Sequence, residues 1–142
     1  MSENENRIMG IDFGRKRIGI ALSDPLKIFA YSYTVIPNDS QKFSELKKII
    51  QDKGIVKIIL GIPNEFKASS TSVVEDVKKF KNDIEIKFGI EVLLWDETYT
   101  SSLAQNKILE SVTSKKKRRN KSLVDMNSAS IILQEYLNSI SN

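Results

Sequence analysis

Residues 8–24 read IMGIDFGRKRIGIALSD, and this stretch decides the fold. Two mainly apolar runs, Met9–Phe13 and Arg17–Ser23, are separated by a short turn at Gly14–Lys16. Apolar runs of this length bounded by turn residues are typical of adjacent strands. A third run, Ile28–Ile36, follows after a second turn. The opening of the chain therefore predicts a three-stranded antiparallel meander.

The rest of the chain predicts strands that alternate with helices. Ile55–Ile62 is a nearly continuous β-branched run, as in strands buried on both faces, and Ile90–Trp95 is another hydrophobic strand. Apolar residues at helical spacing predict helices over four segments: one capped by Ser40 and ended by Gly54, then Ser72–Phe88, Tyr99–Val112 and Ser122–Ile140. The order βββαβαβαα predicts an α/β domain with a mixed five-stranded sheet, in which parallel strands extend the meander.

The composition is that of one ordinary soluble domain. The 142 residues include 22 Lys and Arg, 18 Asp and Glu, and 40% hydrophobic residues, with a formal net charge of +4. A chain of this size can bury a single core, so residues 1–142 are expected to form one domain. The longest apolar stretch is too short to span a bilayer, and the N-terminus is polar, so a cytoplasmic protein without a membrane partner is expected.

The sequence contains neither Cys nor His. This excludes disulfides, thiol catalysis, Ser-His-Asp triads and zinc sites built from thiolates or imidazoles. An enzyme of this composition must use carboxylates, Lys, hydroxyls or a metal held by oxygen. Oxygen ligands favour hard cations such as Mg²⁺ or Mn²⁺.

Asp12 is an acidic residue inside an apolar strand. The two-residue period of a strand places it on the same face as Ile8 and Gly10. A carboxylate on such a face is unfavourable unless it is paired or binds a metal. The alternative is that Asp12 caps the following turn, or pairs with Arg15 or Arg17.

Asp96 and Glu97 directly follow the strand Ile90–Trp95. They therefore lie at its carboxyl end, where open α/β sheets place their sites. The alternative is that one of them caps the helix beginning near Tyr99, a role that suits the shorter Asp96 better.

Asp125 lies four residues before Ala129, on the stripe of the last predicted helix that faces inward. The alternative is a capping box formed with Ser122. Each acid is weak evidence alone. Together, an acid on the first strand, one after the last strand and one on an inward helix face predict a cage of oxygen ligands for divalent cations.

Basic residues concentrate in two segments. One is Arg15, Lys16 and Arg17; the other holds Lys115, Lys116, Lys117, Arg118, Arg119 and Lys121. Without the second segment the chain has 16 basic and 18 acidic residues, so its positive charge is local. Local positive charge favours contact with phosphates, and a solvated charged surface is the alternative.

Four segments in order along the chain resemble the motifs of the YqgF/RuvX family, which has the ribonuclease H-like fold. They are IDFGRKRIGIALSD at 11–24, LGIPNEF at 60–66, FGIEVLLWDETYTS at 88–101 and NKSLVDMNSASIILQEYL at 120–137. Members of this family are described as Holliday junction resolvases and as nucleases of the 5′ end of the 16S rRNA precursor. The chain departs from the family pattern at Thr98, where Arg is usual, and so lacks one expected contact to phosphate or to a neighbouring acid.

The resemblance implies that Asp12, Glu97 and Asp125 are catalytic and bind Mg²⁺ or Mn²⁺, with Asp96 beside them. It implies hydrolysis of phosphodiester bonds by metal-assisted attack of water, which needs no His. The residues expected to hold the nucleic acid are Arg15, Lys16, Arg17, Lys116, Lys117, Arg118, Arg119 and Lys121, although Lys121 can equally be a solvated lysine.

The favoured substrate is an RNA precursor, which implies a nuclease of pre-16S rRNA that acts in ribosome biogenesis, with ribosomal particles as partners. A junction resolvase needs a dimer with a self-complementary apolar patch. The sequence shows no apolar stripe beyond those that the core should consume, so a monomer or weak dimer is expected. The alternatives are a Holliday junction resolvase acting on branched DNA and a non-catalytic RNA-binding module, which would not need the three acids beside a cation.

Overall fold

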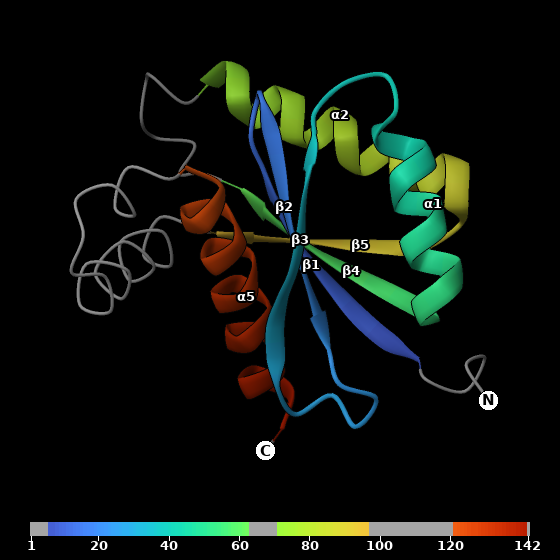
Figure 1. Cartoon of the computed structure of the whole chain (residues 1–142), viewed down its shortest axis with the longest axis vertical. Helices are drawn as coiled ribbons and strands as arrows, with labels where there is room; N and C mark the ends of the chain where they lie inside the picture. The colour runs from blue at the N-terminus through green and yellow to red at the C-terminus, as the bar shows by residue number, and fades with distance from the viewer. Residues whose placement is uncertain (1–5, 63–70, 97–120, 142) are drawn as a thin grey trace.

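The computed structural model describes residues 6–62, 71–96 and 121–141, with only the backbone described at 71 and at 121–127. A sheet lies between helices on its two faces (Figure 1). The strands are β1 (Arg7–Phe13), β2 (Arg17–Ser23), β3 (Ala30–Pro37), β4 (Ile55–Ile62) and β5 (Glu91–Asp96). The helices are α1 (Lys42–Lys53), α2 (Thr71–Phe88) and α5 (Lys121–Ile140).

The sheet confirms the predicted mixed topology. Its strand order is β3-β2-β1-β4-β5, with β1, β2 and β3 antiparallel and β4 and β5 parallel to β1. The carboxyl ends of β1, β4 and β5 therefore lie at the same edge of the sheet. The predicted element order holds for every described element, and the helix expected over Tyr99–Val112 lies outside the described residues.

The third strand begins at Ala30 rather than at Ile28, because Asp24 holds the preceding residues in a loop. Its Oδ1 atom accepts hydrogen bonds from the backbone N–H groups of Ile28 and Phe29, both at 2.8 Å. Within this loop Lys27 adopts a left-handed φ of 61°. The expected strand over Ile28–Ile36 is thus shifted to Ala30–Pro37.

The prediction that Ser40 caps the first helix is wrong. The N-cap position belongs to Gln41, because the carboxylate of Asp39 accepts the Gln41 N–H at 2.9 Å and displaces the helix start by one residue. The predicted end is confirmed, since Gly54 closes α1 with a left-handed φ of 63°.

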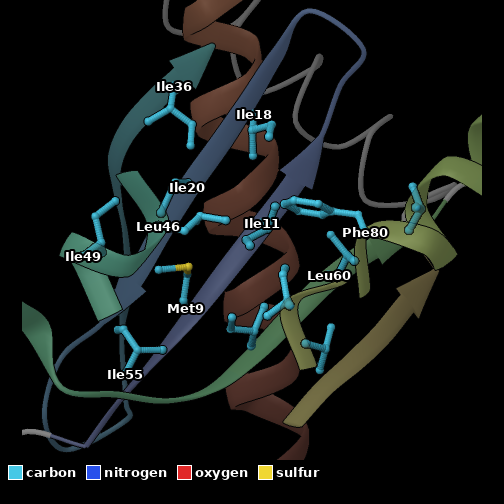
Figure 2. Close-up of a cluster of buried hydrophobic side chains, with 14 of the residues drawn as sticks. Met9, Ile11, Ile18, Ile20, Ile36, Leu46, Ile49, Ile55, Leu60 and Phe80 are labelled. Atoms are coloured by element: carbon cyan, nitrogen blue, oxygen red, sulfur yellow. The ribbon is translucent and has the colours of Figure 1, made fainter. Parts of the chain in front are cut away.

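The face of the sheet covered by α1 and α2 holds the larger core. Figure 2 shows Met9, Ile11 and Ile20 of the sheet, with Leu46 of α1 and Phe80 of α2, in one continuous apolar cluster. All five side chains are at most 2% exposed. At about 1.5–3 kcal/mol for each large side chain buried, this face supplies most of the hydrophobic stabilisation.

Among the described helices, α5 covers the opposite face of the sheet (Figure 1), and it lies very close to β1. A Cβ atom added at Gly10 would lie 2.7 Å from the Cβ of Leu133 and 2.9 Å from the carbonyl oxygen of Ala129. Only glycine fits between this strand and this helix. Among the described helices, none combines the length and the apolar character needed to cross a membrane.

Candidate functional site

Asp12 lies near the carboxyl end of β1, on the face that α5 covers. Met9 and Ile11 point into the core beneath α1 and α2, whereas Ile8 and Gly10 contact α5. The alternation of a strand then assigns Asp12 to the α5 face, where it is half-buried and pairs with Gly19 of β2.

The turn after Asp12 is held by its own backbone and by Asn38. Gly14 donates its N–H to the carbonyl of Arg17 at 2.9 Å, and a Cβ at Gly14 would collide with that same oxygen. The Asn38 side chain donates to the Gly14 carbonyl at 2.7 Å, and its backbone N–H donates to the Lys16 carbonyl at 2.9 Å. Sequence reasoning missed Asn38, which follows β3 and fixes the turn from a distance of more than 20 residues along the chain.

The three basic residues of this turn have different surroundings. Arg15 donates to the hydroxyl of Ser72, and its Nε lies 4.0 Å from a carboxylate oxygen of Asp76, so it links the turn to α2. Its side chain remains 60% exposed. Lys16 is exposed and Arg17 is half-buried. An ion pair as exposed as Arg15–Asp76 contributes at most about 1 kcal/mol, so the guanidinium can exchange it for a phosphate.

Asp96 is the exposed last residue of β5. In the two-residue alternation of β5, Asp96 falls on the same face as Val92 and Leu94, which pack against the core beneath α1 and α2. The side chain of Trp95 lies on the α5 side. Alternation therefore assigns Asp96 and Asp12 to opposite faces of the sheet. Glu97 lies outside the described residues.

Asp125 occupies a position in the first half of α5, while its side chain is outside the described part of the chain. Ala129 and Ile132, four and seven residues further on, are both fully buried, which confirms the predicted inward stripe. The described part of α5 spans Lys121–Ile140, and the side chains of Ser122 and Asp125 lie outside the described residues, so the alternative capping box stays untested.

The basic segment is largely outside the described residues. This holds for Lys116, Lys117, Arg118 and Arg119, and Lys121 is described only as the first residue of α5. Their proposed contacts with nucleic acid stay predictions.

Trp95 fixes the end of β5 to α5, a link that sequence reasoning did not find. Its Nε1 donates to a carboxylate oxygen of Glu135 at 3.1 Å, and its ring meets Tyr136 edge-on, with centroids 5.8 Å apart. The ammonium group of Lys57 lies 5.2 Å from the centre of the Tyr136 ring and 3.8 Å from a Glu91 oxygen. The hydrogen bond with the Tyr136 hydroxyl raises the pKa of Lys57 above its ordinary value.

In the described ranges no three acidic side chains gather closely enough to hold a metal ion. Of the predicted ligands Asp12, Glu97 and Asp125, only Asp12 has a described side chain. The ligand set therefore stays a prediction, to which the structure contributes the placement of Asp12 and the position of Asp125 along α5.

The sequence is similar to a well-populated family. Residues 6–139 match the family model described as "RuvX: Holliday junction resolvase". A protein of Clostridium acetobutylicum is 39% identical over 136 residues, covering 94% of this chain and 99% of its own. A protein of Sulfurihydrogenibium sp. is 36% identical over 138 residues, covering 96% and 92%. Both are named "Putative pre-16S rRNA nuclease".

Solved structures share the fold at much lower identity. RuvC of T. thermophilus, in complex with a Holliday junction substrate, matches with a TM-score of 0.58 and 12% identity, covering 95% of this chain and 96% of its own. The Fowlpox virus resolvase, in complex with Holliday junction DNA, matches with a TM-score of 0.53 and 15% identity, covering 96% and 99%. These likenesses confirm the expected ribonuclease H-like fold of the resolvases. On the full-length match to its model, the chain belongs to the RuvX Holliday junction resolvase family.

Proposed function

We propose that residues 1–142 form one metal-dependent nuclease domain that hydrolyses phosphodiester bonds, with the 16S rRNA precursor as its substrate. The relatives' name supports the substrate, and the family supports the class of reaction. The observation that carries the proposal is the placement of Asp12, half-buried near the carboxyl end of β1 and on the face covered by α5.

The path of α5 supports pairing Asp12 with Asp125. Gln134 accepts the N–H of Ala30, at the level where β1 starts, whereas Ala129 contacts Gly10 further along that strand. The helix thus runs against the direction of β1. Two residues from Gly10 to Asp12 span about 6.6 Å, and one helical turn back from Ala129 to Asp125 spans about 5.4 Å. Both steps lead toward the same edge of the sheet.

The strand period supports Glu97 rather than Asp96 as the third ligand. Asp96 falls on the face opposite Asp12. The next position of a two-residue period returns to the face of Trp95, which is the α5 face. Glu97 is therefore the acid of this pair that we assign to the site.

The donor set fits a hard divalent cation, because all three proposed ligands are carboxylates and the chain has neither His nor Cys. Mg²⁺ or Mn²⁺, when bound, supplies the Lewis acidity for hydrolysis by water. The carboxylates of Asp12, Glu97 and Asp125 would hold the ion. The guanidinium and ammonium groups of Arg15 and Lys16 would bind the substrate backbone, a contact that is blind to sequence and sensitive to salt.

The test incubates the full chain and Mn²⁺ with an RNA spanning the mature 5′ end of 16S rRNA and, separately, with a four-way DNA junction. We expect cleavage of the RNA by the wild type and by Asp83→Asn, the matched control, which changes a half-buried aspartate of α2 that is paired with Lys79. Asp12→Asn should not cleave.

Two results would contradict the proposal. Symmetric paired nicks in the junction without RNA cleavage would establish the resolvase alternative. RNA binding that is equal in the wild type and Asp12→Asn, with no metal-dependent cleavage by either, would establish the non-catalytic RNA-binding module.

A further inference from the structure

Exposed apolar side chains gather in the loop between β2 and β3. Among the described residues, eight large apolar side chains are exposed, and three of them, Leu26, Ile28 and Phe29, belong to this loop. Leu26 is 76% and Phe29 67% exposed. The expectation that the core consumes all the apolar stripes is therefore wrong, because the shifted start of β3 leaves Ile28 and Phe29 in a surface loop. We call these three side chains the apolar tip.

The loop that carries the apolar tip is held in one shape by hydrogen bonds to its backbone. The Asp24 carboxylate accepts two of its N–H groups. Gln134 of α5 donates to the carbonyl of Ile28 at 3.0 Å and accepts the N–H of Ala30 at 2.8 Å. The backbone is thus engaged within the chain, and the loop offers a partner its side chains. A loop already held in its bound shape loses little conformational entropy on binding.

A groove of about 430 Å³ lies further along β3, between that strand and α1. Its lining combines apolar side chains with a charged rim, and the apolar part includes Tyr33, Ile36 and Ile49. The charged rim consists of Glu45, Lys48 and Asp52. Two acids and one lysine give this rim a net negative charge, and among the described residues no ion pair joins either acid to a cation. The groove therefore fits an apolar group that is accompanied by a positive charge.

The apolar tip and the groove lie on the same face of the sheet. Tyr31 pairs with Leu22, which packs in the core beneath α1 and α2. Phe29 comes two residues before Tyr31 and continues this ladder, because its carbonyl accepts the N–H of Asp24 at 3.1 Å. Strand alternation then assigns Phe29 to the face of α1, where Tyr33 lines the groove. A two-fold axis between tip and groove can therefore bring each tip to the groove of another copy.

We propose that a second copy of this chain inserts its apolar tip into this groove, while its own groove receives the tip of the first copy. The tip brings the positive charge that the groove fits. Lys27 lies between Leu26 and Ile28, and among the described residues no ion pair engages it. In the dimer its ammonium group meets the acidic rim, so charge and apolar surface are complementary in the same contact.

The area favours a second copy over a partner that fills the groove alone. A large apolar side chain offers roughly 200 Å² when fully exposed, so the three side chains of the tip leave about 400 Å² exposed. The tip covers a similar area of the groove, and the two-fold axis makes the contact twice, so up to about 1,600 Å² is buried, the size of an ordinary specific interface. A different partner in the groove would leave the tip in water.

The test is sedimentation velocity of the full chain at increasing protein concentration. We expect a reversible monomer–dimer equilibrium for the wild type. Leu26→Asp and Phe29→Asp should each weaken dimerisation at least about tenfold, because each places a charge in the apolar part of the contact. The matched control is Ile86→Lys, which changes an 82% exposed side chain of α2 and should dimerise as the wild type does.

Charge reversal tests the reciprocal contact. Lys27→Glu and Asp52→Lys should each weaken dimerisation at least about tenfold, because each variant brings like charges together twice in its own dimer. An equimolar mixture of the two variants should regain association. In the mixed dimer, one contact pairs the new Glu with the new Lys, and the other is the wild-type contact.

Four results would overturn the proposal. A wild type that stays monomeric at all concentrations would do so, as would assembly beyond the dimer, which a closed two-fold contact does not allow. The third is a dimer that Leu26→Asp and Phe29→Asp weaken no more than Ile86→Lys does. The fourth is a mixture of the charge variants that associates as weakly as each variant alone. Dimerisation does not depend on the proposed nuclease activity, so either can fail without the other.

Discussion

The sheet packs against α1 and α2 on one face and against α5 on the other, and the two faces are made of different residues. Large aliphatic and aromatic side chains such as Ile11, Leu60 and Phe80 fill the first face. On the second face, β1 presents Gly10 and Asp12.

The face covered by α1 and α2 therefore serves mainly stability, and the face covered by α5 carries the residues of the proposed chemistry. A face of large apolar side chains holds the sheet together, with the rings of Phe13 and Phe80 only 4.8 Å apart. On the second face, which also holds Ile8 and Ile59, Gly10 lets α5 come close to β1, and the proposed function has carboxylates on the strand and on the helix meet beyond this contact. Substitutions on the two faces should therefore differ in their effects on cleavage and on stability.

The first prediction separates the two adjacent acids after β5 by the face to which each belongs. Glu97→Gln should abolish metal-dependent cleavage, because the proposed function makes Glu97 a metal ligand. Asp96→Asn should leave measurable cleavage, because strand alternation directs Asp96 to the other face. Initial rates at saturating Mn²⁺ for both variants check this. The reverse ranking would mean that the ligand of this pair is Asp96.

The second prediction concerns the contact that brings α5 against β1. Gly10→Ala places a methyl group 2.7 Å from Leu133 Cβ, so we expect a loss of about 1–3 kcal/mol in unfolding free energy and a fall in cleavage per folded molecule. The matched control is Gly89→Ala, which has a left-handed φ of 64° and no atom within 4 Å of the added Cβ. It should cost about 1–2 kcal/mol by backbone strain and leave cleavage unchanged.

Urea unfolding combined with cleavage rates corrected for the folded fraction distinguishes these two glycines. Equal rates for Gly10→Ala and Gly89→Ala would show that the close approach of α5 serves packing alone.

The third prediction is the smallest and concerns the stabilising face. Glu85 accepts the backbone N–H of Val92 at 3.2 Å, and this bond, followed by that with Lys81, lowers the pKa of Glu85 below its ordinary value of 4.5. A lowered folded-state pKa gives stability that is present above pH 4.5 and is lost as the pH falls through the folded-state pKa.

The variant Glu85→Gln should therefore be less stable than the wild type at neutral pH, with the difference narrowing below pH 4.5. Urea unfolding at neutral and at acidic pH measures this, with the exposed Glu75→Gln on the same helix as the control. A difference that stays constant with pH would contradict the role of the Glu85 carboxylate.

The sequence predicted the strands and helices well because their signals are local. The β-branched run Ile55–Ile62 and the glycine at position 54 define β4 and the end of α1 without any distant contact. The helix start near Ser40 could not be found in the same way. Asp39 and Ser40 are both residue types that often cap helices. Only the structure shows that the Gln41 N–H donates to the Asp39 carboxylate.

The sequence could predict the placement of a site residue only where the period of a strand or of a helix determines the face on which that residue lies. The strand period assigned Asp12 to the face of Ile8 and Gly10, and the structure shows that this face packs against α5. The bond from Trp95 to Glu135 joins residues 40 positions apart, and the contact of Arg15 with Ser72 joins residues 57 apart. The spacing of residues along the chain does not predict contacts between positions so far apart. The exposure of Phe29 was missed for a related reason, since the hydrogen bond from the Phe29 N–H to the Asp24 carboxylate, which holds Phe29 outside β3, is a loop contact.

The most direct test of the division between the two faces compares Asp12→Asn with Leu60→Ala in one experiment that records thermal melting and Mn²⁺-dependent cleavage of the rRNA precursor. Leu60 is fully buried in the larger core, so its truncation should cost about 2–5 kcal/mol while the molecules that remain folded still cleave. Asp12→Asn should abolish cleavage and leave the melting temperature equal or higher, because it removes repulsion among the carboxylates that the proposed function brings together. Wild-type cleavage by Asp12→Asn, with a melting temperature lowered by many degrees, would contradict the account and make Asp12 a cap of its turn.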